Sequence, residues 1–172
     1  AFHNADYANV ERYKNLLFAD QRYYQTTLEM YARAANSEGD SEKFEKYLEQ
    51  GVTDFPLHAY FFDELATLYV TDERYAQCVD LADHVLAADS VSLKAMYLKA
   101  HALFKTDKQA ECIEISKKLV EADTHSTYAE ANYYAGLFIM NKLETIYLPT
   151  RIGSKDFVRA KNEMKKVCSE AR

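Results

Sequence analysis

Residues 59–92 read AYFFDELATLYVTDERYAQCVDLADHVLAADSVS, and this stretch decides the fold. Its first part places four apolar residues at the i, i+3, i+4 and i+7 spacing of one helical face: Phe62, Leu65, Ala66 and Tyr69. A polar break at residues 71–74 has helix-capping chemistry, and a second apolar stripe runs from Tyr75 to Leu86. The stretch therefore predicts two amphipathic helices joined by a short turn.

The same pattern returns with a period of 34 residues. The segment Leu86-Ala87-Ala88-Asp89 recurs as Val120-Glu121-Ala122-Asp123. When units start at residues 25, 59 and 93, small residues occupy the eighth place of each, and a fourth unit from Ala129 continues this column: Ala32, Ala66, Ala100 and Gly136. Repetition at this period indicates stacked helical units, each of which buries its apolar faces against its neighbours.

A sequence with small residues at this 34-residue spacing resembles the tetratricopeptide repeat, a 34-residue helix–turn–helix unit. The resemblance covers residues 25–172. That family keeps small residues at the eighth and twentieth places because the two helices cross closely there. Here Cys78, Cys112 and Ala160 hold the twentieth place, whereas Phe44 is too large for the pattern. The resemblance implies an all-α, right-handed solenoid of antiparallel helix pairs, with about nine helices.

We expect a single solenoid over residues 1–172, divided into the second helix of a preceding unit (1–24), unit one (25–58), unit two (59–92), unit three (93–128) and unit four (129–172) with an insert at 141–154. In the insert, Leu143 and Ile146 continue a helical spacing, so unit four's first helix should run to about Tyr147. Tyr147 and Ile152 should then pack on protein as a cap, or as the seat of a next unit. The start in mid-unit indicates a piece of a longer solenoid.

Composition and charge exclude several classes of protein. The 172 residues include only four Gly and two Pro, too little turn chemistry for a β-sandwich or barrel. The net charge is −6: residues 1–141 carry 13 Lys and Arg against 23 Asp and Glu, and residues 142–172 carry 8 against 4. An acidic bulk disfavours nucleic acid as a partner. No stretch approaches the roughly 20 apolar residues of a membrane span.

No residue pattern predicts catalysis, a metal site or a cofactor. The five His form no HExxH spacing, and no glycine-rich phosphate loop is present. Asp80 and His84 stand at the i, i+4 spacing of a ligand pair, but a solvated helix face explains them better. Cys78, Cys112 and Cys168 are too far apart for a disulfide framework, so we expect free thiols, the first two buried. Unpaired thiols favour a cytoplasmic location; the periplasm would require a signal peptide that has been removed.

The resemblance also implies where a partner binds. In the family, the second, fifth, ninth, twelfth and thirteenth places line a concave groove. The candidate groove residues on this basis are Glu29, Arg33, Tyr60, Asp63, Thr67, Lys94, Tyr97, His101, Phe104, Tyr133 and Leu137. Four of them form an aromatic patch of the residue types enriched in binding hot spots: Tyr97, His101, Phe104 and Tyr133. One branch of the family grips chaperone carboxylates, but Glu29 and Glu64 would repel such a group.

These observations predict a non-enzymatic scaffold that binds a peptide or protein segment in its concave groove. A second interpretation is a structural module of a longer multi-repeat chain, or a self-associating assembly unit whose groove is closed by its own copies. The state of the groove separates the two, since a hydrated groove in a monomer favours a ligand. An enzyme with a site at the insert is a third interpretation, and no acid–base pair supports it.

Overall fold

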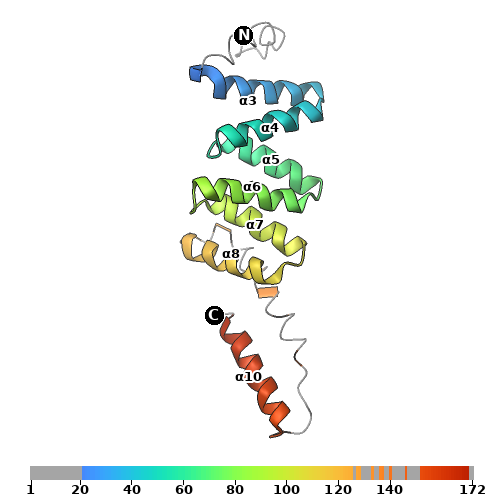
Figure 1. Cartoon of the computed structure of the whole chain (residues 1–172), viewed down its shortest axis with the longest axis vertical. Helices are drawn as coiled ribbons and strands as arrows, with labels where there is room; N and C mark the ends of the chain where they lie inside the picture. The colour runs from blue at the N-terminus through green and yellow to red at the C-terminus, as the bar shows by residue number, and fades with distance from the viewer. Residues whose placement is uncertain are drawn as a thin grey trace. The chain divides into compact units, whose positions relative to one another are not determined.

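The structure is a computed structural model that describes residues 21–125 and 152–170, together with single positions between these ranges. In the described part, every regular element is an α-helix. The helices are α3 (Gln21–Glu38), α4 (Ser41–Asp54), α5 (Ala59–Thr71), α6 (Tyr75–Ala88), α7 (Leu93–Lys105), α8 (Gln109–Ala122) and α10 (Lys155–Glu170) (Figure 1). The all-α prediction is confirmed. The count of nine depends on helices expected within 1–24 and 129–147, which lie largely outside the described residues.

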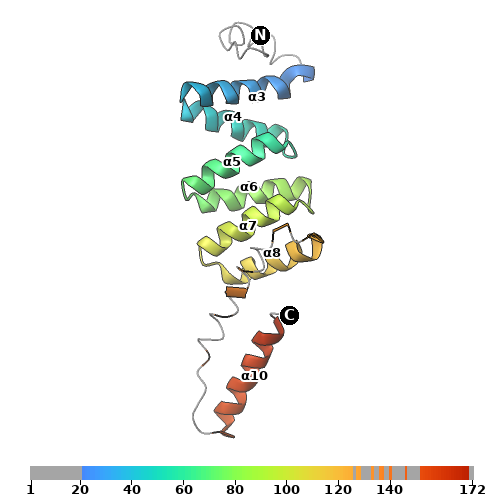
Figure 2. The same ribbon diagram turned by 180° about the vertical axis from the view of Figure 1, so that it is seen from behind.

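The chain divides into two compact units, Ala1–Ser90 and Val91–Arg172. In the first unit, α3 packs on α4, α4 on α5, and α5 on α6, so that neighbours in sequence are neighbours in space (Figure 2). In the second unit, α7 packs on α8. The helix pairs α3–α4, α5–α6 and α7–α8 lie within the expected units one, two and three. However, α3 begins at Gln21, four residues before the boundary that the sequence predicted.

The turn inside each helix pair places one residue in the left-handed conformation. Gly39 has φ 75°, Glu73 has φ 56° and Asp107 has φ 57°. These three residues are spaced by the 34-residue period. Gly153, with φ 84°, precedes α10 in the same way, near the end of the expected insert. The left-handed region suits glycine because it has no Cβ, so Glu73 and Asp107 are strained where Gly39 is not.

Two backbone hydrogen bonds close each of these turns in the same pattern. In the second pair, the Glu73 amide donates to the Val70 carbonyl at 3.2 Å and the Arg74 amide donates to the Tyr69 carbonyl at 2.8 Å. The equivalent bonds recur 34 residues earlier and later, with donors at Gly39, Asp40, Asp107 and Lys108. This is the Schellman arrangement, which satisfies the last carbonyls of the first helix and reverses the chain. The turn chemistry therefore repeats with the same period as the sequence.

The small residues at the eighth place mark close crossings in two of the three pairs. Ala32 and Ala100 are both fully buried. In the α7–α8 pair, the Cys112 thiol lies 3.4 Å from the Ala100 carbonyl and donates to it, which brings the eighth and twentieth places together. Cys78 and Cys112 are buried free thiols, as expected; the side chain of Cys168 lies outside the described part.

Ala66 departs from this pattern. We expected it to be almost fully buried, but it remains partly exposed. The close approach of α5 is instead to α4, at Gly51. A Cβ on Gly51 would stand 2.2 Å from the ring of Phe61, which is itself fully buried. Helix α5 therefore packs closely on α4 through Phe61 and Gly51, on a different face from Ala66.

The C-terminal end confirms one expectation and corrects another. Helix α10 is the last helix of the expected unit four, and Ala160, its twentieth-place residue, is buried together with Val167. Its first turn is capped by Ser154, whose hydroxyl oxygen accepts a hydrogen bond from the Phe157 amide at 3.1 Å. Ile152 was predicted to pack on protein, but its side chain is 83% exposed. It lies next to Gly153, whose backbone is in the left-handed conformation. Tyr147 lies outside the described residues. None of the described helices is both long and apolar enough to cross a membrane.

The strain at Glu73 predicts a stabilising substitution. Glu73→Gly removes a side chain from the left-handed region, so the free energy of unfolding should rise by about 0.5–1 kcal/mol, part of the gain being offset by the larger entropy of the unfolded chain. Urea denaturation of the two proteins measures the difference. Glu73→Ala is the control, because it removes the same charge but keeps the Cβ. Equal stabilities for the Gly and Ala variants would contradict the strain argument.

The crossing at Ala100 predicts a destabilising substitution. Ala100→Leu inserts three carbon atoms where α7 and α8 touch, and overpacking should cost about 1–3 kcal/mol and lower the melting temperature. Lys108→Ala, at the exposed start of α8, should leave the melting temperature almost unchanged. Thermal unfolding followed by circular dichroism compares the two. If both variants melted alike, the helix pair would not cross where the repeat places it.

Candidate functional site

The predicted groove positions in the first unit form one connected cluster across two helices. On α3, the Arg33 guanidinium contacts the Glu29 carboxylate at 2.8 Å, and its Nε donates to the same oxygen at 2.9 Å. The guanidinium carbon also lies 4.1 Å from the ring centroid of Tyr60, which belongs to α5. The fifth and ninth places of unit one, Glu29 and Arg33, are thus joined to the second place of unit two, Tyr60.

His58 joins this cluster, and the sequence analysis missed it. It is the N-cap residue of α5, where its ring lies 4.9 Å from that of Phe61. Its Nε2 is 3.7 Å from the second oxygen of Glu29. His58 precedes the first residue of the repeat as it was divided, so no groove position was assigned to it. A search of the capping residues beside Tyr60 would have found it.

Asp63 and Thr67 are exposed one and two turns further along α5. The Thr67 hydroxyl donates to the Asp63 carbonyl at 2.8 Å, a bond within the helix. They extend the surface of the cluster toward the C-terminal end of α5, and Asp63 adds a carboxylate to it. This face therefore carries the carboxylates of Glu29 and Asp63 and one cation, Arg33, which is bound by Glu29 and Tyr60.

In the second unit, the aromatic groove positions lie on α7. Tyr97 and His101 stack with their ring centroids 6.5 Å apart. Tyr97 also packs against Tyr128, at 5.0 Å, a residue that was not predicted. Phe104 is half-buried and Lys94 is exposed, both on the same helix. The predicted aromatic patch is therefore partly assembled on α7, with Tyr128 as an additional member.

The last two predicted groove residues, Tyr133 and Leu137, lie between residues 125 and 152, where the structure describes only some positions. Tyr133 is 63% exposed, and Leu137 is half-buried. None of the eleven predicted groove residues is buried in the structure.

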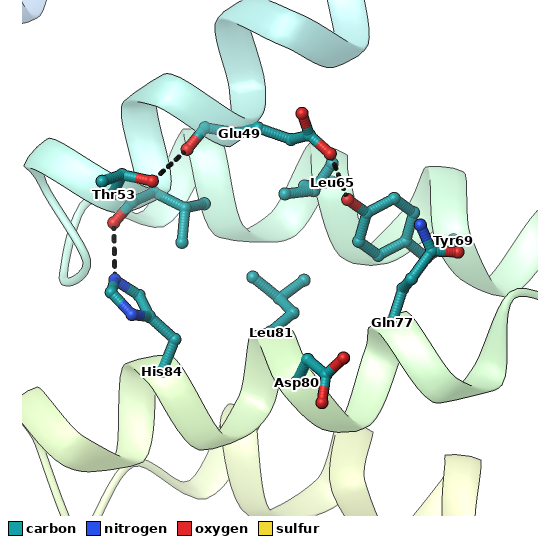
Figure 3. Close-up of a pocket in the computed structure, with 9 residues that line it drawn as sticks. Glu49, Thr53, Leu65, Tyr69, Gln77, Asp80, Leu81 and His84 are labelled. Atoms are coloured by element: carbon teal, nitrogen blue, oxygen red, sulfur yellow. Dashed lines mark hydrogen bonds between the residues drawn. The ribbon is translucent and has the colours of Figure 1, made fainter.

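A pocket of about 420 Å³ lies elsewhere in the first unit, where α4, α5 and α6 meet (Figure 3). The residues lining it are Glu49, Val52, Thr53, Leu65, Tyr69, Gln77, Asp80, Leu81 and His84. Figure 3 shows Leu81 near the centre with polar side chains around it. The ring of His84 donates from Nε2 to the Val52 carbonyl at 3.2 Å, which joins α6 to α4. Sequence reasoning did not find this pocket, because its walls come from three helices.

A polar network holds one side of the pocket in place. The Tyr69 hydroxyl donates to Glu49 Oε1 at 2.9 Å. Arg74, at the start of α6, donates to Glu45 on α4 and lies over the Tyr69 ring at 4.4 Å. The hydrogen bond from Arg74 lowers the pKa of Glu45, and burial, aided by the bond to Glu49, raises the pKa of Tyr69. The network therefore ties α4, α5 and α6 together.

The described residues offer little chemistry for catalysis. Among them, no three His, Cys, Asp or Glu are grouped so as to hold a metal ion. Asp80 and His84 stand on one face of α6, but His84 Nε2 is engaged with the Val52 carbonyl. Burial raises the pKa of the Cys78 thiol to about 11 and also raises that of Cys112. Both thiols are therefore protonated at neutral pH and poor nucleophiles.

Comparison with known proteins identifies the class of fold. No protein-family model matches the chain, and no curated protein matches it in sequence. Several solved structures of MamA share its fold. One MamA crystal structure is 17% identical with a TM-score of 0.57, over 94% of this chain and 85% of MamA. Another, at 15% identity and a TM-score of 0.57, covers 84% of this chain and 73% of MamA.

A third match is the MamA fragment 41-end from Desulfovibrio magneticus RS-1, which is 16% identical with a TM-score of 0.53 over 94% of each chain. MamA is a helical repeat protein of tetratricopeptide type. At these identities the likeness establishes the fold alone: the chain has the all-α, helical-repeat fold of MamA.

The Glu45–Arg74 pair predicts a pH-dependent loss of stability. Because Arg74 depresses the pKa of Glu45 in the folded state, the pair contributes stability above the unfolded pKa of a glutamate and loses it as the pH falls through the lower, folded value. Glu45→Gln should cost about 1 kcal/mol at pH 7 and progressively less below pH of about 4.5. Urea titrations from pH 7 to pH 3 measure this. Glu121→Gln, an exposed change on α8, serves as the control; a cost for Glu45→Gln that stayed constant with pH would contradict the assignment.

Proposed function

We propose that this chain is a non-enzymatic interaction scaffold that binds a peptide or protein segment through two surfaces: the face formed by Glu29, Arg33 and Tyr60 in the first unit, and the aromatic positions of α7 in the second. The observation that carries the proposal is the contact of Arg33 with both Glu29 and Tyr60. It joins groove positions of two successive repeats into one surface. The tetratricopeptide-like fold supports a role of this kind, since such repeats expose extended concave surfaces.

The Arg33 cluster is suited to binding because it is already ordered. The guanidinium is held by a carboxylate and a ring, yet its side chain is 50% exposed. A partner that contacts Arg33 and Tyr60 therefore need not immobilise a flexible arginine, and this lowers the entropic cost of association. Arg and Tyr are also residue types that dominate binding energy in protein interfaces. On α7, the stacked rings of Tyr97 and His101 offer a second rigid anchor.

The chemistry of the chain supports a partner that is a protein. Its net charge of −6 opposes the phosphate contacts that bind nucleic acid. The buried thiols, with their raised pKa values, lack the reactivity of a nucleophile. A mixed face of carboxylates, one held arginine and aromatic rings fits a peptide segment that carries both polar and apolar side chains.

Affinity capture with matched variants tests the proposal. The full chain is immobilised, and partners captured from a lysate of its source are quantified and then purified for direct binding measurements. Arg33→Ala with Tyr60→Ala, and Tyr97→Ala with Phe104→Ala, should each weaken binding of the purified partner by about tenfold or more. The control is Glu114→Ala with Lys118→Ala, which removes an exposed ion pair on α8.

Two results would contradict the proposal that the partner binds at the groove residues. One is full binding by both groove variants, and the other is an equal loss in the α8 control. Sedimentation of the wild-type chain over a range of concentrations separates the alternative role. A self-associating module would form larger species that the Arg33 and Tyr60 variant disrupts, whereas a scaffold would stay monomeric until its partner is added.

A further inference from the structure

The pocket between α4, α5 and α6 is separate from the groove and has its own chemistry. Its volume of about 420 Å³ falls in the range of about 300–1,000 Å³ found for small-ligand sites. Aliphatic side chains of Val52, Leu65 and Leu81 line its inner part, and all three are largely buried. The ring of Tyr69 adds an aromatic wall on one side (Figure 3).

The polar groups that line the pocket favour positive charge. Glu49 and Asp80 contribute two carboxylates, and no Lys or Arg lines the pocket. The nearby cation, Arg74, is engaged by Glu45 and by the Tyr69 ring. In the described part of the chain, the side chain of Asp80 forms no hydrogen bond or ion pair. Its carboxylate is exposed on the surface of α6, where an incoming cation can reach it.

The charge of the surrounding unit acts in the same direction. Residues 1–90, which make up the first compact unit, carry 7 Lys and Arg against 17 Asp and Glu, a net charge of −10. Residues 91–141 carry equal numbers of both kinds, six of each. The negative potential of the chain is therefore concentrated in the unit that contains the pocket, and such a field attracts and steers cationic ligands.

We infer that this pocket binds an organic cation, an amidinium, guanidinium or ammonium group carried on an apolar body. The cationic group pairs with Asp80, with the carboxylate of Glu49 adding to the field. The apolar body enters the pocket that Leu81 and the ring of Tyr69 line. The network around Tyr69 and the bond from His84 to Val52 hold the walls in place before the ligand arrives. The cation comes either from an arginine or lysine side chain of a peptide or from a free small molecule.

Three probes of equal size and different charge test this inference on the full chain. Benzamidine is cationic, benzamide neutral and benzoate anionic. Titration of each into isotopically labelled protein, followed by the backbone amide signals, should show saturable shifts with benzamidine at residues lining the pocket, with a Kd of about 1 mM or tighter. Benzamide should bind at least about tenfold more weakly and benzoate should not bind, because only the cation forms a charge-assisted bond with Asp80.

Matched variants make the test specific to Asp80. Asp80→Asn should weaken benzamidine binding by about tenfold, whereas Asp83→Asn, one turn of α6 away and outside the pocket, should change it by less than about twofold. Both variants remove one negative charge, so a general charge effect would move them equally. Melting temperatures equal to that of the wild type show that both remain folded.

A peptide arm identifies the source of the cation. Acetyl-Ala-Arg-Ala-amide that binds more tightly than benzamidine indicates a side chain of a protein partner, and the reverse order indicates a free small molecule. The inference is overturned if benzoate binds as well as benzamidine, if benzamidine does not saturate below about 10 mM, or if Asp83→Asn weakens binding as much as Asp80→Asn does.

Discussion

The helix pairs depend on one backbone constraint, a residue held in the left-handed conformation between the two helices. Gly39, Glu73 and Asp107 each occupy this position, 34 residues apart, and the amide that follows each reaches back to a carbonyl five residues earlier. This bond ends the first helix and reverses the chain within three or four residues, so the second helix returns along the first. That Glu73 and Asp107 accept the strain shows that the reversal matters more than the local preference of the residue.

Once the chain is reversed, the place where two helices touch depends on the size of their side chains. In the α7–α8 pair the contact is at Ala100, whose carbonyl accepts the Cys112 thiol. Helix α5 behaves differently, because its closest approach is to α4, where Gly51 leaves room for the ring of Phe61. Ala66 is partly exposed, and a pocket lies where α4, α5 and α6 meet.

The acidic first unit thus presents two different surfaces. One is the cluster in which Arg33 is held between Glu29 and Tyr60, a rigid and partly neutralised face. The other is the pocket, whose carboxylates at Glu49 and Asp80 have no cation among the lining residues. Because the first surface carries its own counter-ion and the second does not, they suit different partners. We propose a peptide with mixed side chains as the partner of the first, and an organic cation as the ligand of the second.

The sequence by itself determined the helices and their turns, since these depend on local spacing. The 34-residue phase predicted the polar break before Tyr75, the small residue Ala100 at a crossing, and the buried free thiols of Cys78 and Cys112. The resemblance to the tetratricopeptide repeat implied a shared face for Glu29, Arg33 and Tyr60, although it overlooked His58. The exposure of Ala66 and Ile152 and the existence of the pocket were decided by tertiary structure alone. Those features depend on which residue of one helix meets which residue of another; between α4 and α5, for example, the ring of Phe61 takes the space that a Cβ on residue 51 would fill.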